Sequence, residues 1–332
     1  MNIEQETILS VRGLTVSLRR DEETIPIVQS TSFDVRKGEI FGLVGESGSG
    51  KSLSLRSIMR LLPSQMKVGG EILWHGRDVN RMSGRDLRRV RGGEISMIFQ
   101  EPMTALNPVL TIGRQISESL KAHGNHGRPG RKARAIELLD LVGIPSAERR
   151  LEDYPHQFSG GMRQRAMIAI ALASNPSLIL ADEPTTALDV TIQDQILALL
   201  LRLRDDLGVS VALVTHDLGV VSAVCDRVSI MYAGEILEKG PAEDLLVRPR
   251  HPYTLGLIDS IPQAGASREP LRPISGSPPS PRARPAGCLF SPRCRFVQPL
   301  CETSRPALKK LAGQRESACM RMDALIEEHV FQ

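Results

Sequence analysis

Apolar and polar residues alternate along the first part of the chain, over Ile8–Leu18 and again over Thr31–Val35. Such alternation predicts strands of a sheet that is exposed on one face. The continuous apolar run Ile40–Val44 predicts a buried strand. Helical spacing of apolar residues follows over Leu53–Leu62 and stops at Pro63, which cannot continue a helix.

The middle of the chain changes from strand patterns to helical ones. Residues 71–76 predict a strand that enters a turn, residues 86–91 a short basic helix, and residues 95–99 another strand. From about 100 to 160 the pattern is helical, with a break expected over 124–130 where glycine and proline cluster. We therefore expect an all-helical insertion over about residues 100–160.

Strands and helices then alternate. Helix Gly161–Ala173 precedes the apolar strand Leu178–Ala181, and helix Ile192–Leu207 precedes strand Val209–Val214. This succession predicts an α/β fold with a mostly parallel sheet covered on both faces. Pro262–Gly287 is rich in Pro, Ser, Gly and Arg and predicts a linker or extended arm.

Composition limits the class of protein. The 332 residues are 41% hydrophobic and 24% charged, as in an ordinary soluble globular protein, and the net charge of +4 is too small to indicate nucleic-acid binding. The longest apolar runs, Ala166–Ala173 and Ile196–Leu201, are far shorter than the roughly 20 residues that span a bilayer. With no N-terminal signal pattern, the chain is expected in the cytosol, and any membrane role depends on partners.

A phosphate-binding pattern follows the first buried strand. Residues 45–52, Gly-Glu-Ser-Gly-Ser-Gly-Lys-Ser, fit the pattern G-x-x-x-x-G-K-[ST] between a strand and a helix. The glycines let backbone N–H groups turn towards anionic oxygens, and the helix that begins at Lys51 adds its positive end. Lys51 supplies charge for the β- and γ-phosphates, and the Ser52 hydroxyl is a ligand for Mg²⁺. The alternative is a glycine-rich turn with a surface lysine, which the flanking strand and helix disfavour.

Two carboxylates end a later strand. Asp182 and Glu183 follow the apolar residues 178–181, at the carboxyl end where α/β folds place ligands. A carboxylate oxygen suits Mg²⁺, so Asp182 is the metal candidate, and Glu183 is positioned to orient or deprotonate an attacking water. A solvated acidic strand end is the alternative, and the phosphate loop in the same chain argues against it.

A third motif lies between these two in the sequence. Residues 158–165, Phe-Ser-Gly-Gly-Met-Arg-Gln-Arg, place Ser159, Gly160 and Gly161 at the start of a helix, which forms a second anion site. Together the three motifs resemble the ATP-binding cassette (ABC) family, whose signature is usually Leu-Ser-Gly-Gly-Gln. This chain departs from that signature at Phe158 and Met162 and keeps the serine and both glycines.

The resemblance implies roles for further residues. Gln100 corresponds to the glutamine that touches Mg²⁺, the segment 187–189 to the loop that crosses between subunits through Asp189, and His216 to the histidine that contacts the γ-phosphate. Leu18 aligns where the family commonly has an aromatic residue that stacks on adenine. Metal binding is implied for Ser52, Gln100 and Asp182, and ATP binding for Gly45, Ser47, Gly48, Ser49, Gly50, Lys51, Ser52, Leu53 and Gln100.

The same resemblance implies a paired ATPase. In ABC proteins two cassettes pack head to tail, and each ATP lies between the phosphate loop of one and the signature of the other. This chain has one of each, so Ser159, Gly160, Gly161 and Asp189 are expected to serve the ATP of a partner cassette. The isolated chain is then expected to hydrolyse ATP weakly.

Two segments narrow the resemblance to one subfamily. Residues 100–108 and 251–254, His-Pro-Tyr-Thr, resemble ATPase subunits of dipeptide and oligopeptide importers. This implies a P-loop ABC domain of mixed sheet and helical subdomain over residues 1–250 and a C-terminal extension over 251–332. His251 itself is expected to start a helix at a proline-containing turn.

The subfamily also implies partners and a location. These are a second, different ABC ATPase subunit, two transmembrane permease subunits and an extracytoplasmic peptide-binding protein that acts indirectly, with the chain at the cytoplasmic face of the inner membrane. The same architecture serves nickel and other small solutes, so the solute stays open. Two further classes of protein also stay open: a soluble ABC ATPase that acts on DNA or ribosomes, and a nucleotide-binding regulator without turnover.

Four of the five cysteines cluster near the end of the chain, within residues 288–319. In a cytosolic protein such clustering favours a metal over disulfides, although the C-x2-C pair of common zinc sites is absent. Thiolates alone suit an iron–sulfur cluster, and the extension of peptide importers is similar here. A [4Fe–4S] cluster is the first expectation, zinc the second and free thiols the third; the candidate ligands are Cys288, Cys294, Cys301 and Cys319.

Overall fold

The computed structural model describes residues 6–123, 127–186, 188–261 and 273–331. These residues form two compact units. The first contains the N-terminal residues up to Ile8, Val35–Ile40 and Arg77–Val214, and the second contains Leu9–Asp34, Phe41–Gly76 and the chain from Thr215 onward. The predicted domain boundary at residue 250 stays a prediction.

The first unit is built on three parallel strands, β6 (Ile95–Ile98), β7 (Leu178–Asp182) and β8 (Ser210–Thr215). Strand β7 lies between the other two and pairs with both in parallel. Every residue of the three strands is buried, as expected for strands covered on both faces. The sequence analysis predicted each of them within one residue at either end.

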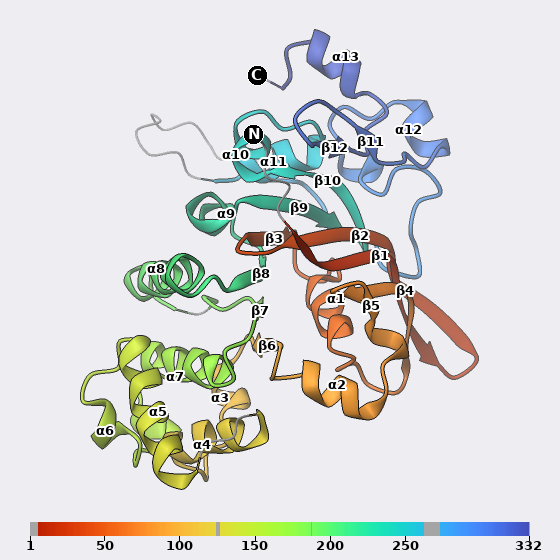
Figure 1. The fold of residues 1–332 in the computed structure, drawn as a ribbon. Coiled ribbons are helices and arrows are strands. Elements are labelled where there is room, and N and C mark those ends of the chain that lie inside the picture. Colours follow the sequence, from red (N-terminus) through yellow and green to blue (C-terminus); the bar gives the residue numbers. More distant parts are fainter. Residues whose placement is uncertain (1–5, 124–126, 187, 262–272, 332) are drawn as a thin grey trace. The chain divides into compact units, whose positions relative to one another are not determined.

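Helices make up the segment between β6 and β7 (Figure 1). Helices α4, α5 and α7 pack against one another, and no strand occurs among the described residues 100–160, as predicted. The helices of the first unit are α2 (Gly84–Val90), α3 (Pro102–Ala105), α4 (Ile112–His123), α5 (Arg128–Leu141), α6 (Ala147–Arg150), α7 (Gly160–Leu172) and α8 (Val190–Leu207), with 3₁₀ turns η1 (Val79–Arg81) and η2 (Pro155–Gln157) and the short strand β5 (Arg77–Asp78).

Two of the helix boundaries that differ from the sequence prediction have a clear backbone cause. Helix α1 (Lys51–Ile58) ends before the apolar pattern does, because Arg60 takes a left-handed conformation with a φ of 51° and closes the helix end. The break expected over 124–130 does not extend to its end, because α5 already includes Pro129, which the first turn of a helix tolerates. Residues 124–126 lie outside the described part of the chain.

The second unit contains two groups of strands. Strands β1 (Thr7–Arg20), β2 (Glu23–Arg36) and β4 (Met66–Trp74) are neighbours in the order β2-β1-β4, and β1 pairs with β4 antiparallel. Strand β3 (Ile40–Val44) pairs with β9 (Arg227–Tyr232) in parallel, and β9 pairs with β10 (Glu235–Pro241) antiparallel. The predicted strands over 8–18, 31–35 and 40–44 are confirmed.

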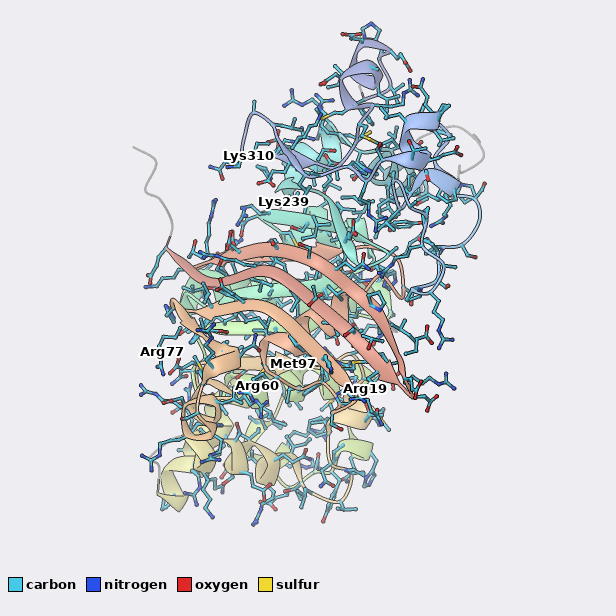
Figure 2. All side chains as sticks on the ribbon, turned by 90° about the vertical axis from the view of Figure 1, so that its right-hand side faces the viewer. Arg19, Arg60, Arg77, Met97, Lys239 and Lys310 are labelled. Carbon is cyan, nitrogen blue, oxygen red and sulfur yellow. The ribbon has the colours of Figure 1, made fainter. Side chains whose placement is uncertain are left out.

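The C-terminal extension continues this second group of strands. Strand β12 (Glu316–Ser317) pairs with β10 and with β11 (Lys309–Lys310), so the extension completes the edge of β10. Figure 2 shows Lys239 on β10 and Lys310 on β11. Both residues have Glu316 of β12 as their register partner.

Burial also joins the extension to the rest of the second unit. Leu289 and Phe290 share one apolar cluster with Tyr232 and Tyr253. Glu238 of β10 is fully buried and pairs with Arg315 of the extension at 3.0 Å. Desolvation raises the pKa of Glu238, so this carboxylate depends on its hydrogen bonds to remain ionised.

The remaining helices of the second unit are short. The predicted His-Pro-Tyr helix start is confirmed, because His251 Nδ1 accepts a hydrogen bond from the backbone N–H of Tyr253 at 3.0 Å. Residues 273–287 contain no helix or strand, and 262–272 of the expected linker lie outside the described residues. In the described part of the chain, no helix is long and apolar enough to span a bilayer. The helices are α9 (Leu218–Val224), α10 (Ala242–Val247), α11 (Pro252–Asp259), α12 (Pro299–Thr303) and α13 (Met322–Glu327), with a 3₁₀ turn η3 (Ser291–Arg293).

Candidate nucleotide-binding and cysteine sites

The predicted phosphate loop lies between β3 and α1, in the second unit. A Cβ at Gly45 would stand 2.0 Å from the carbonyl oxygen of Met231, so no larger residue fits there. Gly50 caps α1 in a left-handed conformation with a φ of 102°, and a Cβ there would meet Val28 at 2.9 Å. The loop therefore needs glycine at both positions to pack against strands β9 and β2.

The lysine of the loop is held by the loop itself. Lys51 is 4% exposed, and its Nζ donates to the carbonyl oxygens of Gly45 at 2.7 Å and Glu46 at 2.9 Å. The backbone N–H of Glu46 donates to the hydroxyl of Tyr253 at 3.0 Å. We expected successive loop N–H groups to turn towards a phosphate. The N–H of Glu46 does not, because it already donates to the tyrosine hydroxyl.

In the first unit the structure brings two predicted site residues together. Gln100 Nε2 donates to Glu183 Oε2 at 3.0 Å, and the hydroxyl of Thr186 donates to the same oxygen at 3.0 Å. Glu183 has a φ of 49°, a left-handed conformation that costs energy in a non-glycine residue. Such strain is found at functional sites, where surrounding contacts hold the residue in place.

Thr186 was not found by the sequence analysis, although a hydroxyl three residues after Glu183 was a usable signal. Asp182 ends β7 directly before Glu183 and is fully buried. A buried carboxylate at a strand end that parallel pairing holds in register is a suitable ligand for a hard cation. The carboxyl end of β7 thus carries the metal candidate and the base candidate in succession.

The signature residues begin helix α7. The Ser159 hydroxyl caps the helix by accepting from the backbone N–H of Met162 at 3.3 Å. Ser159 and Gly160 are exposed, whereas Gly161 is buried and a Cβ there would meet Ile192 of α8 at 2.8 Å. The helix start is therefore open to a ligand, and its second glycine serves packing.

The segment predicted to cross between subunits precedes α8. The Asp189 side chain caps α8 by accepting from the backbone N–H of Ile192 at 2.9 Å. Ala187 lies outside the described residues. Val190, the first residue of the helix, is 74% exposed, so this helix start presents an apolar side chain to solvent.

His216 follows β8 and is exposed. The next residue, Asp217, caps α9 by accepting from the backbone N–H of Gly219 at 2.7 Å, which fixes the chain on the C-terminal side of the histidine. Leu18, the position aligned with an adenine-stacking aromatic residue, is partly buried opposite Met66 in the pairing of β1 and β4. The phosphate loop and His216 belong to the second unit, and Gln100, Asp182 and Glu183 to the first.

The structure brings all four clustered cysteines to one cavity of about 20 Å³ in the extension. They arrive from separate segments, and the backbone N–H of Cys288 donates to the carbonyl oxygen of Cys301 at 2.8 Å. Among the described residues, no group of three or more His, Cys, Asp or Glu side chains is arranged to hold one metal ion. The residues around the cavity include Cys288, Cys294, Cys301, Cys319, His251 and Phe290.

Burial favours the protonated thiol at Cys288, Cys294 and Cys319. Desolvation raises the pKa of Cys288, that of Cys294 to about 11 and that of Cys319 to about 12. The other cysteines of the cavity raise these pKa values further, because neighbouring thiolates repel one another. A metal that binds here must displace those protons, which is the usual cost of forming a thiolate site.

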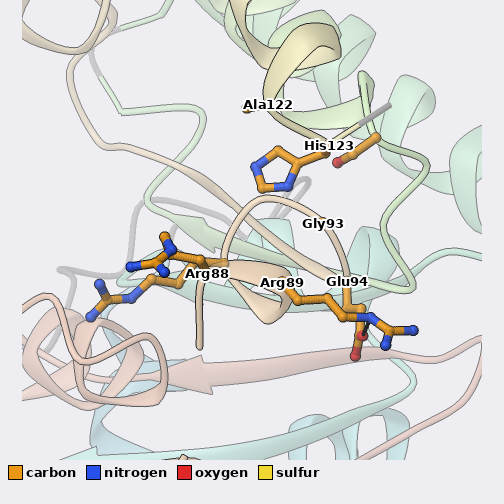
Figure 3. Close-up of a pocket in the computed structure, with 8 residues that line it drawn as sticks. Arg88, Arg89, Gly93, Glu94, Ala122 and His123 are labelled. Atoms are coloured by element: carbon orange, nitrogen blue, oxygen red, sulfur yellow. Dashed lines mark ion pairs between the residues drawn. The ribbon is translucent and has the colours of Figure 1, made fainter. Parts of the chain in front are cut away.

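A separate basic pocket of about 650 Å³ lies in the first unit (Figure 3). It is lined by Arg88, Arg89, Arg91, Glu94 and His123, and the Arg89 guanidinium pairs with the Glu94 carboxylate at 3.2 Å. These residues precede β6 or end α4, whereas Gln100 follows β6. The pocket therefore lies at the amino end of the parallel strands, opposite the edge that carries Glu183.

Comparison with known proteins covers nearly the whole chain. The ABC transporter model matches residues 28–186, and the model of the oligopeptide/dipeptide transporter C-terminal region matches residues 237–301. The dipeptide transport ATP-binding protein DppD of Bacillus subtilis is 46% identical, over 98% of both chains. The oligopeptide transport ATP-binding protein AppD of the same organism is 48% identical, over 94% of this chain and 96% of that protein.

Solved structures agree with these relatives. The dimeric ATP-binding cassette MJ0796, in a post-hydrolysis state bound to ADP and Pi, is similar with a TM-score of 0.63 and 31% identity, over 70% of this chain and 98% of that chain. The cbiO1 protein from Clostridium perfringens shares the fold with a TM-score of 0.62. The chain belongs to the family of ABC transporter ATP-binding proteins that carry the oligopeptide/dipeptide transporter C-terminal region.

Proposed function

We propose that this chain hydrolyses ATP to power the import of di- and oligopeptides through a membrane ABC transporter. The observation that carries the proposal is the presence of two regions in one chain, an ABC transporter region and a peptide-transporter C-terminal region. Relatives named for dipeptide and oligopeptide transport align with both regions along nearly their full length.

The loop residues have separate roles in binding ATP. Lys51 pairs with the β- and γ-phosphates, and N–H groups from Ser47 to Leu53 complete the cradle at the start of α1. Ser52, Asp182 and Gln100 would hold Mg²⁺, which would supply positive charge to neutralise the phosphates. The proposed cradle thus consists of Gly45, Ser47, Gly48, Ser49, Gly50, Lys51, Ser52 and Leu53.

Glu183 is the proposed general base. Its Oε2 accepts two hydrogen bonds, from Gln100 and Thr186, which orient the carboxylate for taking a proton from the attacking water. Gln100 donates to the proposed base and is itself a proposed metal ligand, which suits it to report the state of the nucleotide. His216 is exposed at the end of β8 and is proposed to contact the γ-phosphate.

A second cassette is proposed to complete each ATP site. Ser159 and Gly160 are exposed at the start of α7, where backbone N–H groups and the helix dipole favour a phosphate. The related cassette MJ0796 is dimeric with ADP and Pi bound. We place Ser159, Gly160, Gly161 and Asp189 against the ATP of a partner, a different ATPase subunit of the same transporter.

Exposed apolar side chains support docking to permease subunits. Phe99 is 39% exposed, Met103 57% and Val109 75%; Phe99 precedes Gln100, Met103 lies in α3 and Val109 follows that helix. Exposed apolar groups gathered in one segment mark protein interaction sites. A permease bound here would act on Gln100 directly, with the chain held at the cytoplasmic face of the inner membrane and the extracytoplasmic binding protein acting through the permeases.

A metal centre is proposed for the cysteine cavity. Four thiols around one cavity are a donor set that suits an iron–sulfur cluster, and zinc is the second candidate. Because the thiols do not form a single-ion site as they stand, binding requires their side chains to move towards the cavity. Iron and sulfide analysis of anaerobically purified protein tests the cluster, and zinc without iron would replace it.

ATP hydrolysis by the complex recovered from membranes with this chain tests the function. Stimulation by a peptide-loaded binding protein is the expected result, and Lys51→Ala is the matched variant that should abolish it. Membrane recovery with stimulation by nickel or another solute, and none by peptides, would replace the substrate class. Activity in a complex that never associates with membranes would favour a soluble ABC ATPase instead.

A further inference from the structure

A bidentate ion pair joins the cysteine-bearing extension to the phosphate loop. Arg293 Nη1 lies 2.6 Å from Glu46 Oε2, and Nη2 lies 3.0 Å from Glu46 Oε1. Arg293 ends the 3₁₀ turn η3, one residue before Cys294, and Glu46 is the second residue of the phosphate loop. Both residues belong to the second unit, although they are 247 positions apart in sequence.

Arg293 is fixed from several sides. Its side chain is 5% exposed, its Nε donates to the carbonyl oxygen of Ser275 at 2.9 Å, and its guanidinium lies 5.7 Å from the ring centroid of Tyr232. Tyr232 in turn packs against Tyr253 with ring centroids 4.6 Å apart. A planar guanidinium with this many partners has one position, so its contact with the loop is a fixed point.

Glu46 receives three separate restraints. Its carboxylate pairs with Arg293, and its backbone N–H donates to the hydroxyl of Tyr253. Its carbonyl oxygen accepts from Lys51 Nζ. A solvent-exposed ion pair stabilises a conformation only weakly. This pair is bidentate, and its arginine side chain is largely buried. The restraints form a continuous path from the extension to the lysine that the proposed function assigns to ATP.

We propose that Arg293 is a positioning residue for nucleotide binding: through Glu46, the extension sets the conformation of the phosphate loop and the starting position of Lys51. This rests on the proposed role of residues 45–52 in ATP binding. The extension is then part of the nucleotide site, and its folding around the cysteine cavity determines how well the loop is formed for ATP.

A double-mutant cycle on the full chain tests this, with the Kd of a fluorescent ATP analogue as the readout. Glu46→Gln and Arg293→Met should each weaken binding by about tenfold, and the double variant should bind no worse than either single one. Arg293→Lys keeps the positive charge but loses the two-pronged guanidinium. Its Kd for the analogue should lie between those of Arg293→Met and the unchanged chain. A shared contact predicts this non-additivity, whereas separate losses of stability would add.

Arg295→Met is the matched control, because Arg295 pairs with Asp259 at 3.0 Å, two residues from Arg293 and with a 46% exposed side chain. It should bind the analogue within twofold of the unchanged chain. If Arg293→Met does not fold, Glu46→Gln still tests the contact without altering the extension. Unchanged affinity in Glu46→Gln, with Lys51→Ala abolishing binding, would overturn the inference; no effect of Lys51→Ala would overturn the proposed function itself.

Discussion

Replacement of Glu183 by glutamine separates binding of ATP from its hydrolysis. The amide of glutamine can keep an oxygen where Oε2 accepts from Gln100 and Thr186, so the two hydrogen bonds of 3.0 Å survive. The side-chain volume and the backbone requirement at φ 49° are unchanged. What the substitution removes is the ability to accept a proton from water.

The expected loss of turnover follows from the loss of this proton acceptor. General-base catalysis contributes roughly 100- to 10,000-fold, which corresponds to about 3–5 kcal/mol of the barrier. Phosphate release from the assembled transporter at saturating ATP should fall by this factor, while the Kd of a fluorescent ATP analogue stays within about threefold. Retained binding with lost turnover is the signature of a base.

Glu94→Gln provides the matched control. Glu94 is a carboxylate of the same unit, paired with Arg89 at 3.2 Å at the amino end of β6. Its removal should leave turnover unchanged. Turnover of Glu183→Gln within about tenfold of the unchanged complex would refute the assignment of Glu183 as base, because proton transfer would then proceed without it.

Two further substitutions test the loop and the helix start of the extension. Gly45→Ala places a Cβ 2.0 Å from the Met231 carbonyl oxygen, so ATP-analogue binding should weaken more than about tenfold; unchanged affinity would show that the loop relaxes freely. Burial lowers the pKa of His251 to about 3 from 6.5, so the unfolded chain takes up this proton first as pH falls, and stability is lost below pH 6.5 by up to about 1.4 kcal/mol per pH unit. His251→Asn keeps the helix cap without titrating and should flatten the loss between pH 6 and 4, measured by urea unfolding through the single tryptophan, Trp74; an identical pH dependence would contradict this.

The sequence predicted what local pattern determines. Buried strands such as β3 and β7 are continuous apolar runs, and the phosphate loop, Asp182 and Glu183 follow them at fixed spacing. Helix ends were less predictable, because the apolar pattern continues past Ile58 although the backbone at Arg60 turns left-handed. The strained backbone at Glu183 depends on its neighbours in space, which the spacing of residues does not encode.

Contacts between segments that are far apart in sequence could not be predicted from the sequence. Glu46 fits the loop pattern as a variable position, and nothing near it indicates an arginine 247 residues later. The cysteines were recognised as a cluster by number and spacing, but their arrangement around one cavity depends on chain segments that only the fold brings together. Tertiary packing decides these features.

The pairing of β12 with β10 has a practical consequence for isolating the ATPase part. A chain ended near residue 250 would leave β10 with unpaired N–H and C=O groups along one side, because Glu238 and Lys239 lose their partners Ser317 and Glu316. It would also remove the Arg315 guanidinium and the strand that pair with Glu238 in the full chain. Bare strand edges recruit other chains, so such a fragment is expected to aggregate, and the shortest soluble version of the ATPase must retain the chain at least through Ser317.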